Sequence, residues 1–251
     1  MRHLKGRPLR AQLDGYLNHI VEHDFNALGH RVRNPTALRR WLTAYAAATA
    51  TSASFETIRD AATGGQNEKP AKTTTQPYRD VLERLWIIES LPGWLPSRNV
   101  VARLTAPPKH HLADPALAAR LLGVDEEALL RATPAGPPQL RDGPLLGNLF
   151  ESLVTLCVRV YAQAAEAGVS HLRTRGGERE VDLIVSRADQ RLVALEVKLA
   201  RTISDADVRH LHWLREQIGD DLLDAVVIHT GPEAYRRADG IAVVPAALLG
   251  P

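Results

Sequence analysis

Charged side chains interrupt two apolar runs in residues 179–200, which read REVDLIVSRADQRLVALEVKLA. Asp182 stands in the first run, and Glu196 and Lys198 stand in the second. Ionised groups are costly to bury unless they are paired or coordinate a metal. These three residues therefore either lie on a solvated face or form a site.

The two runs are expected to form neighbouring strands. A polar turn at residues 187–190 lies between them, which favours antiparallel pairing. Side chains in a strand alternate between its two faces, so Glu196 and Lys198 are expected on one face and Leu195 on the other. Antiparallel pairing would bring Asp182 to the same end of the strands.

Two carboxylates beside one ammonium group are suited to phosphodiester hydrolysis. Mg²⁺ prefers oxygen ligands and is usually held by one or two carboxylates, by water and by the substrate phosphate. We expect Asp182 and Glu196 to bind Mg²⁺ or Mn²⁺, with the Val197 carbonyl as a further candidate ligand. Lys198 is expected to orient the attacking water or to offset charge that builds on the phosphate.

The spacing of Asp182 from Glu196, Val197 and Lys198 resembles the PD-(D/E)XK motif of the restriction-endonuclease-like superfamily. In that superfamily an acidic residue on the preceding helix often completes the metal site. The resemblance implies this role for Glu151, in the segment GNLFESLV. The implied catalytic set is therefore Glu151, Asp182, Glu196 and Lys198, and its three carboxylates are the implied metal ligands.

Some alternatives remain open at this motif. Val181 stands where the motif has its proline, and Glu178 and Glu180 share a predicted strand face with Asp182. Either glutamate could therefore take the place of Asp182 as a ligand. The charges could also form a surface patch of cross-strand pairs, which would contribute little to stability.

The elements that would position these residues follow one another in the order αβββαβ. The helices have apolar residues at helical spacing, and the strands are short apolar runs bounded by turn residues. The expected helices are residues 143–168 and 204–219, and the expected strands are residues 169–175, 180–186, 191–198, 222–230 and 240–245.

The N-terminal half is predicted to be helical. Helices are expected over residues 8–25, over residues 34–50 with Asn34 as N-cap and over residues 52–63. The next helix carries an apolar stripe at i, i+3, i+4, i+7 and i+8. That stripe consists of Tyr78, Val81, Leu82, Leu85 and Trp86.

Strand-like segments broken by prolines follow this helix, at residues 86–97 and 100–114. A helix, a short helix, a longer helix and then a ribbon is the order of a winged helix-turn-helix, in which the longer helix can enter the major groove of DNA. Arg79, Asp80 and Glu83 make the outer face of the longer helix mixed in charge. A module that only packs against other domains is the alternative.

Three regions are expected. Residues 1–46 are a helical linker region, residues 47–135 are the winged helix-turn-helix domain and residues 136–251 are the nuclease-like domain, with a proline-rich boundary at residues 131–144. The whole order is similar to the C-terminal part of a prokaryotic AAA+ ATPase family of uncharacterised function. The resemblance implies an AAA+ ATPase partner. The chain itself lacks the phosphate-binding loop of an ATPase, because Ala71 stands where that loop needs glycine.

The composition is that of an ordinary soluble protein, with 24% charged residues and a net charge of +2. The single cysteine, and the expectation that no stretch reaches the length of a membrane span, favour a cytoplasmic protein that does not bind membranes. Four arginines cluster within residues 31–40, a pattern that is more often a solvated helix face than a phosphate-binding site unless another feature supports binding. Beside the winged-helix order, nucleic acid is the expected partner, DNA rather than RNA.

Two functions are consistent with these features. The first is a nucleic-acid-binding, Mg²⁺-dependent nuclease-like protein, with DNA endonuclease activity, in an AAA+ ATPase system. The alternative is a catalytically inactive module with the nuclease fold that interacts with or regulates an ATPase.

Overall fold

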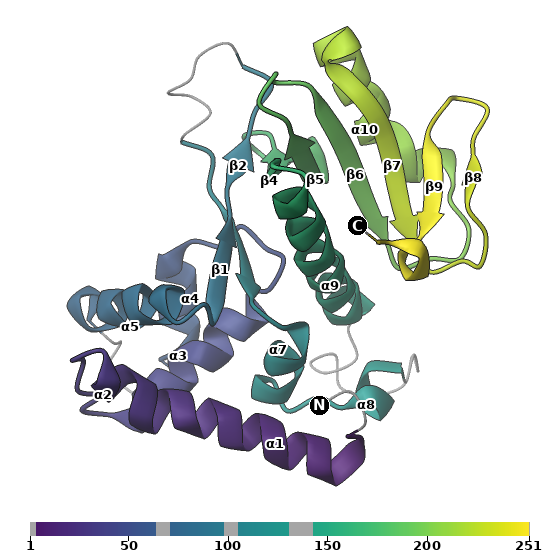
Figure 1. Cartoon of the computed structure of the whole chain (residues 1–251). Coiled ribbons are helices and arrows are strands. Elements are labelled where there is room, and N and C mark those ends of the chain that lie inside the picture. The colour runs from purple at the N-terminus through teal and green to yellow at the C-terminus, as the bar shows by residue number, and fades with distance from the viewer. Residues whose placement is uncertain (1–3, 64–70, 98–104, 131–142, 251) are drawn as a thin grey trace. The chain divides into compact units, whose positions relative to one another are not determined.

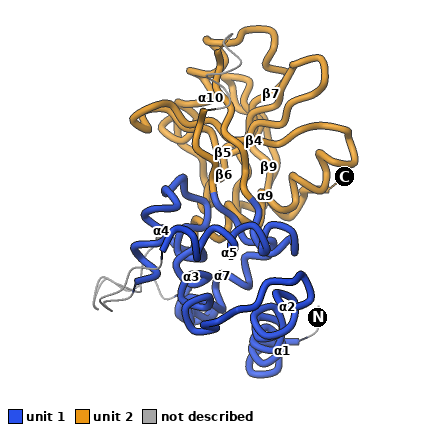
Figure 2. Tube along the Cα trace, turned by 90° about the vertical axis from the view of Figure 1, so that its left-hand side faces the viewer, with its two compact units in different colours: residues 1–89, 110–145 blue, residues 90–109, 146–251 orange. Residues whose placement is uncertain are grey.

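The chain passes back and forth between two units (Figure 2). In this computed structural model, residues 4–63, 71–97, 105–130 and 143–250 are described. Unit 1 comprises residues 1–89 and 110–145, and unit 2 comprises residues 90–109 and 146–251. The proposed domain boundary at residue 136 lies outside the described residues.

Unit 1 is helical over most of its described length, as the sequence predicts. The Asn34 side chain caps one helix by accepting from the Ala37 N–H, and Ser54 caps another by accepting from the Thr57 N–H. The first predicted helix is present as consecutive α and π segments. The helical segments are α1 (Gly6–His19), a π-helix (Ile20–Asp24), α2 (Phe25–Ala27), α3 (Pro35–Ala47), α4 (Phe55–Ala61), α5 (Lys72–Arg84), α7 (Pro115–Leu121) and α8 (Glu126–Leu130).

The predicted apolar stripe of α5 ends earlier than expected. Tyr78, Val81 and Leu82 are buried, whereas the Trp86 side chain is 72% exposed. The prediction is wrong for Trp86 because the helix ends at Arg84 and Trp86 adopts a left-handed φ of 57°. A residue in this conformation commonly ends a helix, so the Trp86 side chain does not continue the apolar stripe of α5.

A two-stranded sheet follows the helices. It pairs β1 (Ile88–Leu91) with β3 (Lys109–Leu112). The division between the units falls within both strands. The order of helix, short helix, longer helix and ribbon is therefore the one expected from the sequence.

Unit 2 contains the remaining elements in the expected order αβββαβ. The long helix ends at Ala164, earlier than the predicted end at Gly168, which instead begins a strand. The elements are β2 (Gly93–Trp94), α9 (Gly143–Ala164), β4 (Gly168–Arg173), β5 (Glu180–Ser186), β6 (Leu192–Lys198), α10 (Asp205–Ile218), a 3-10 turn (Gly219–Asp221), β7 (Leu222–His229), β8 (Tyr235–Arg236), β9 (Ala242–Pro245) and a 3-10 turn (Ala246–Leu248).

The strands of unit 2 form a mixed sheet in the order β2-β4-β5-β6-β7-β9-β8. Strand β5 is antiparallel to both of its neighbours, whereas β7 runs parallel to β6 and to β9. The protein is thus a mixed α/β protein with a helical N-terminal half and a sheet-rich C-terminal half, which confirms the predicted fold class.

Apolar side chains cover both faces of this sheet. Figure 1 shows α9 lying across one of these faces. On one face, Val154 and Val158 of α9 pack with Leu195 and Val197 of β6. On the other face, the buried side chains of α10 pack with Ala194 of β6 and with β7. The alternation predicted for β6 therefore sorts its apolar residues between two cores.

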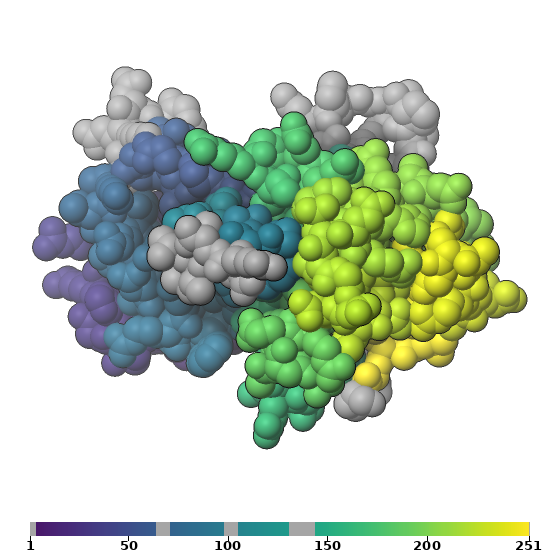
Figure 3. Space-filling view, turned by 90° about the horizontal axis from the view of Figure 1, so that it is seen from above, coloured from purple at the N-terminus to yellow at the C-terminus, as the bar shows by residue number. Residues whose placement is uncertain are grey.

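Residues of α10 also contact the segment after β8. His212 Nε2 lies 3.0 Å from Asp239 Oδ2, and the Arg215 guanidinium donates to the Asp239 carbonyl at 2.9 Å. Figure 3 views this surface, where the yellow-green atoms of α10 lie beside the yellow atoms of the last strands. These contacts fix α10 against the edge of the sheet.

Helix α9 is apolar over most of its length. Within Pro144–Ala164 a stretch of 18 residues has a mean hydropathy of 1.3, so by length and composition alone this helix is long and apolar enough to cross a membrane. The expectation that no stretch reaches such a length is therefore wrong. The side chains of Val154 and Val158 are buried against the sheet, and this packing accounts for part of the apolar character.

Candidate functional site

The three motif residues lie on two paired strands of unit 2. The register pairs Leu183 with Leu195, so Asp182 of β5 and Glu196 of β6 are the next positions along the strands. The Val197 N–H donates to Asp182 Oδ2 at 2.9 Å. Lys198 Nζ donates to Glu196 Oε1 at 2.6 Å, so the two side chains lie together, in agreement with their predicted placement on one strand face.

A β-bulge sets the direction of Asp182. Strand β4 pairs Ser170 with Ile184 but Leu172 with Val181, so two residues of β5 stand opposite His171. These two residues are Asp182 and Leu183. A bulge of this kind redirects side chains and often lies next to a functional site. Simple alternation along the strand could not have predicted it.

Lys109 joins the acidic residues, and the sequence analysis missed it. Its Nζ lies 2.8 Å from Glu151 Oε1, 2.9 Å from Glu180 Oε1 and 3.1 Å from Asp182 Oδ1. The Lys109 side chain is only 1% exposed. We use the name acid cluster for the four carboxylates of Glu151, Glu180, Asp182 and Glu196, among which Lys109 lies.

The sequence gives little indication that Lys109 lies among these carboxylates. Lys109 is the first residue of the short strand β3 and lies far along the chain from its partners. The run of prolines before it indicates only an extended segment. The one available signal is a charged residue at the start of a buried strand, and this signal does not indicate which residues Lys109 contacts.

Burial and charge shift the pKa values of the cluster in opposite directions. Burial would raise the pKa of Asp182, but the ammonium group of Lys109 and the Val197 N–H hold it below its usual value. Burial, followed by the charge of Asp182, raises the pKa of Glu151 to about 8 and that of Glu196 to about 8. The surrounding carboxylates raise the pKa of Lys109 despite its burial. The cluster therefore favours a charged lysine beside an ionised Asp182.

Glu180 takes part in the cluster, so the alternative left open by the sequence is relevant. Its Oε1 contacts Lys109, and its Oε2 accepts from the Arg173 guanidinium at 2.8 Å. Glu180 is thus held by two cations, whereas Asp182 is held by Lys109 and a backbone N–H. Asp182 and Glu180 both lie within reach of the same ammonium group.

The donor atoms of the cluster suit a hard divalent cation. All are carboxylate oxygens, and Glu196 Oε2 is buried without a hydrogen-bond partner among the described residues. Within those residues, however, no three side chains of His, Cys, Asp or Glu are arranged to hold one metal ion. The chemistry of the donors fits Mg²⁺, but the ammonium group of Lys109 lies at the position from which three of the carboxylates would be reached.

Two protein families match different parts of the chain. The family described as a domain of unknown function, DUF8612, matches residues 2–128, just over half of the 251 residues. The chain belongs to this family. A second family, described as a domain of unknown function, DUF4143, matches residues 146–249. The second match covers nearly all of the sheet and both helices that cover it.

Two curated relatives from mycobacteria are similar to almost the whole chain. They are the uncharacterized proteins Mb2031c of Mycobacterium bovis and Rv2008c of Mycobacterium tuberculosis, each 26% identical over 239 residues. The match covers 94% of this chain and 47% of each relative. The chain therefore spans about half the length of the curated relatives it matches.

One solved structure is distantly similar. It is described as a refined half-complex from the tetradecameric assembly of Thermococcus gammatolerans McrB AAA+ hexamers with bound McrC. The identity is 14%, the TM-score is 0.29, and the match covers 81% of this chain and 70% of that one. A likeness this low supports no inference about function.

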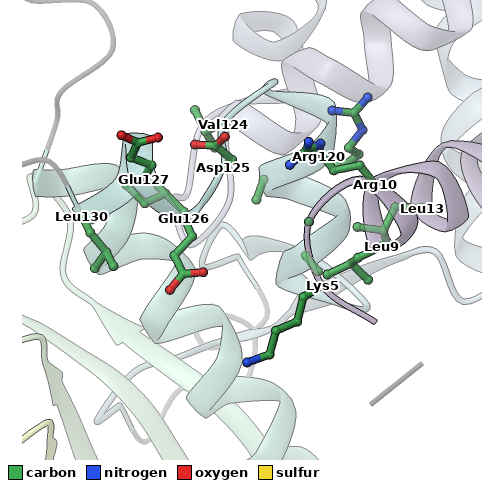
Figure 4. Close-up of a pocket in the computed structure, with 14 residues that line it drawn as sticks. Lys5, Leu9, Arg10, Leu13, Arg120, Val124, Asp125, Glu126, Glu127 and Leu130 are labelled. Carbon is green, nitrogen blue, oxygen red and sulfur yellow. The ribbon is translucent and has the colours of Figure 1, made fainter. Parts of the chain in front are cut away.

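A separate groove lies on unit 1, between α1 and the segment from α7 to α8 (Figure 4). Its volume is about 700 Å³. Leu9 and Leu13 of α1 supply part of its apolar wall, Lys5 and Arg10 lie on the side of α1, and the acidic residues lie at the start of α8. The groove contains none of the predicted site residues.

Proposed function

We propose that the chain hydrolyses phosphodiester bonds in nucleic acid, with Mg²⁺ or Mn²⁺, as part of an AAA+ ATPase system. One observation carries the proposal. Asp182, Glu196 and Lys198 lie on paired strands of an αβββαβ unit, and Glu196 keeps a buried oxygen without a hydrogen-bond partner among the described residues. A buried, unpartnered carboxylate oxygen is costly unless something binds it.

The carboxylates and Lys198 have different roles in this proposal. Asp182 and Glu196 would hold the ion, with Glu151 as a third carboxylate. A bound divalent ion would supply positive charge that lowers the pKa of a water molecule and polarises the phosphate. Lys198 is 31% exposed and can therefore reach a phosphate at the surface while its amine stays beside Glu196. It would offset the charge that develops on the phosphate.

Nucleic acid binding is proposed from unit 1. Arg31 and Arg33 are exposed and line a groove of about 820 Å³ with Thr73 and Thr74 at the start of α5. Arginine side chains and hydroxyl groups are common contacts to the phosphates of DNA. We propose duplex DNA as the ligand, because the order of α3, α4 and α5 followed by the ribbon of β1 and β3 is that of a winged helix.

The AAA+ partner is proposed from the architecture. The chain resembles the C-terminal part of an AAA+ ATPase family, and it spans 47% of the curated relatives, whose remaining length is not represented here. The match to DUF4143 over residues 146–249 is consistent with this assignment. An ATPase module could be supplied by the same polypeptide or by a separate chain.

A second candidate function is an inactive module that interacts with an ATPase. Lys109 favours it, because its ammonium group already pairs with Glu151, Glu180 and Asp182. A protein of this kind would keep the fold and the charges but would show neither metal binding nor cleavage.

The test combines cleavage with thermal stability in a Mn²⁺ titration. Asp182→Ala and Glu196→Ala should abolish both cleavage of duplex DNA and the rise of Tm with Mn²⁺. Lys198→Ala should keep the rise of Tm while cleavage slows roughly a hundredfold, the scale on which one positioned charge acts. Arg187→Gln, in the turn between β5 and β6, is the control and should behave as wild type. Identical Mn²⁺ titrations of wild type and Glu196→Ala would refute the proposed site.

A further inference from the structure

We propose that Lys109 is a resident counter-ion that occupies the acid cluster and must leave it before a divalent cation binds. The inference deepens the proposed function and rests on it. In this proposal Lys109, which lies outside the motif, controls when the metal site is available. Its basis is the geometry of one ammonium group among three carboxylates.

The ammonium group of Lys109 is fully engaged by this cluster. It has three N–H donors, and three carboxylate oxygens lie within 3.1 Å, on Glu151, Glu180 and Asp182. These oxygens come from α9 and β5, so the lysine links the helix to the sheet. A divalent cation would need the same oxygens, because carboxylates are the ligands that Mg²⁺ takes from proteins.

Glu196 stands apart from this arrangement. Its Oε1 accepts from Lys198, whereas its Oε2 is buried without a hydrogen-bond partner among the described residues. The whole Glu196 residue is 6% exposed. The Glu196 Oε2 atom thus has no partner among the described residues, whereas Lys109 contacts one oxygen of each of the other three carboxylates. This is the arrangement expected of a cation site whose charge is balanced from within the chain.

The segment before Lys109 is anchored, so the side chain can leave without the backbone. The imidazole of His171 lies 3.0 Å, through Nε2, from the Pro107 carbonyl oxygen. Gly93 approaches Ala106 so closely that a Cβ on the glycine would lie 2.4 Å from the Ala106 Cβ. The lysine itself has a flexible four-carbon stem. Rotation of that stem would withdraw the ammonium group from the cluster.

Lys109 is also the last residue of its segment in unit 2, and His110 belongs to unit 1. The backbone of β3 therefore continues directly from the ammonium-bearing residue into the other unit. A change in β3 is the most direct covalent route by which unit 1 could influence the acid cluster.

The first test compares metal affinity in the full chain by calorimetry with MnCl₂. Lys109→Met keeps an unbranched side chain close to the length of the lysine stem but removes its charge. It should bind Mn²⁺ tighter than wild type by about tenfold or more, since removing one nearby unit charge changes cation binding on this scale. Adding Glu196→Ala to Lys109→Met should abolish the gain. Lys72→Met, at the exposed start of α5, is the matched control and should leave the affinity unchanged.

A second measurement uses the unaltered protein, in case Lys109→Met does not fold. The chain has five lysines, so the ¹⁵N signals of their ammonium groups can be assigned with single Lys→Arg variants. The Lys109 ammonium is buried, and its protons should exchange slowly with water in the metal-free protein. Saturating Mg²⁺ should abolish that protection while the Lys72 signal stays unchanged.

The outcomes separate this inference from the proposed function. Equal Mn²⁺ affinity of wild type and Lys109→Met would overturn the inference and leave the metal site intact. A Lys109 ammonium signal that stays protected at saturating Mg²⁺ would overturn it in the same way. Absence of Mn²⁺ binding in both proteins would overturn the inference and the proposed function together.

Discussion

At the scale of single residues, His171 is a buried group whose charged form is disfavoured. Its side chain lies in β4 opposite the bulge, and the residue is fully buried. Because a carbonyl oxygen only accepts hydrogen bonds, Nε2 must donate to the Pro107 carbonyl. Its Nδ1 then has no partner among the described residues. The neutral imidazole is the form that this environment accommodates.

His171 should therefore make stability depend on pH. Burial, followed by the charge of Lys109, lowers the pKa of His171 to about 4, against the opposing effects of the Pro107 carbonyl, Glu180 and Asp182. The unfolded chain has the ordinary value of 6.5 and takes up the proton first. Stability is thus complete above pH 6.5 and is lost as the pH falls towards 4.

The measurement is urea unfolding of wild type and His171→Gln at pH 7 and pH 5. Glutamine can still donate to the Pro107 carbonyl but does not titrate. Between these pH values, wild type should lose about 2 kcal/mol more unfolding free energy than the variant. Parallel losses in the two proteins would show that His171 is not the responsible group.

Residue types and spacing predicted part of the candidate site. Asp182, Glu196 and Lys198 could be found because Glu196 follows Asp182 by fourteen positions and a single turn separates the two runs, which is a local pattern. Lys109 could not be found in this way, because its position depends on a contact between segments far apart in sequence. Long-range electrostatic partners leave no periodic trace in a single sequence.

At the scale of secondary-structure elements, the end of α5 is set by backbone hydrogen bonds. The Ile87 N–H donates to the Leu82 carbonyl at 2.9 Å, and the Trp86 N–H donates to the Glu83 carbonyl at 3.1 Å. This pair of bonds is the Schellman motif, and Ile87 and Leu82 are both buried as the motif prefers. The motif places Trp86 at the left-handed position that glycine usually occupies.

Trp86→Gly should stabilise the protein. A left-handed conformation costs an ordinary residue roughly 1–2 kcal/mol, and glycine avoids that cost. The Trp86 side chain is 72% exposed, so its removal gives up little burial. We expect a gain of about 1 kcal/mol in unfolding free energy from guanidinium titration. Trp86→Ala removes the same ring but keeps the strain, and an equal gain in that variant would contradict the explanation.

Elements with clear periodicity and caps were predictable, and departures from periodicity were not. The capping box of Ser204 with Asp207 begins α10 where the sequence predicts a helix start. The bulge in β5 had no such signal, since a period-two pattern does not reveal an extra residue. Alternation alone therefore does not explain the direction of the Asp182 side chain, although the sequence pattern identified the residue.

At the scale of the whole molecule, the net charge hides an uneven distribution. A value of +2 predicts little attraction to a polyanion. The acid cluster is buried and holds its own cation in Lys109, whereas Arg31 and Arg33 are exposed beside a groove. Buried negative charge with an internal partner adds little repulsion at the surface, so the exposed arginines can dominate locally.

The affinity of the full chain for duplex DNA should therefore fall steeply as salt rises. Each phosphate contact releases counter-ions and contributes a slope of about 0.9 to the logarithm of affinity against the logarithm of salt concentration. The double variant Arg31→Gln/Arg33→Gln should bind more weakly, and its slope should be smaller by about 2, one for each lost contact. Fluorescence anisotropy of labelled DNA across a salt series measures both quantities.

A second double variant separates a local contact from a loss of overall charge. Arg187→Gln/Arg191→Gln removes the same two charges from the turn between β5 and β6, where both arginines pair with Asp189. It should keep the wild-type slope, because neither arginine lines the groove. If both double variants lose affinity and slope equally, net charge rather than the groove governs binding. An affinity that stays flat across the salt series would contradict phosphate-dominated binding altogether.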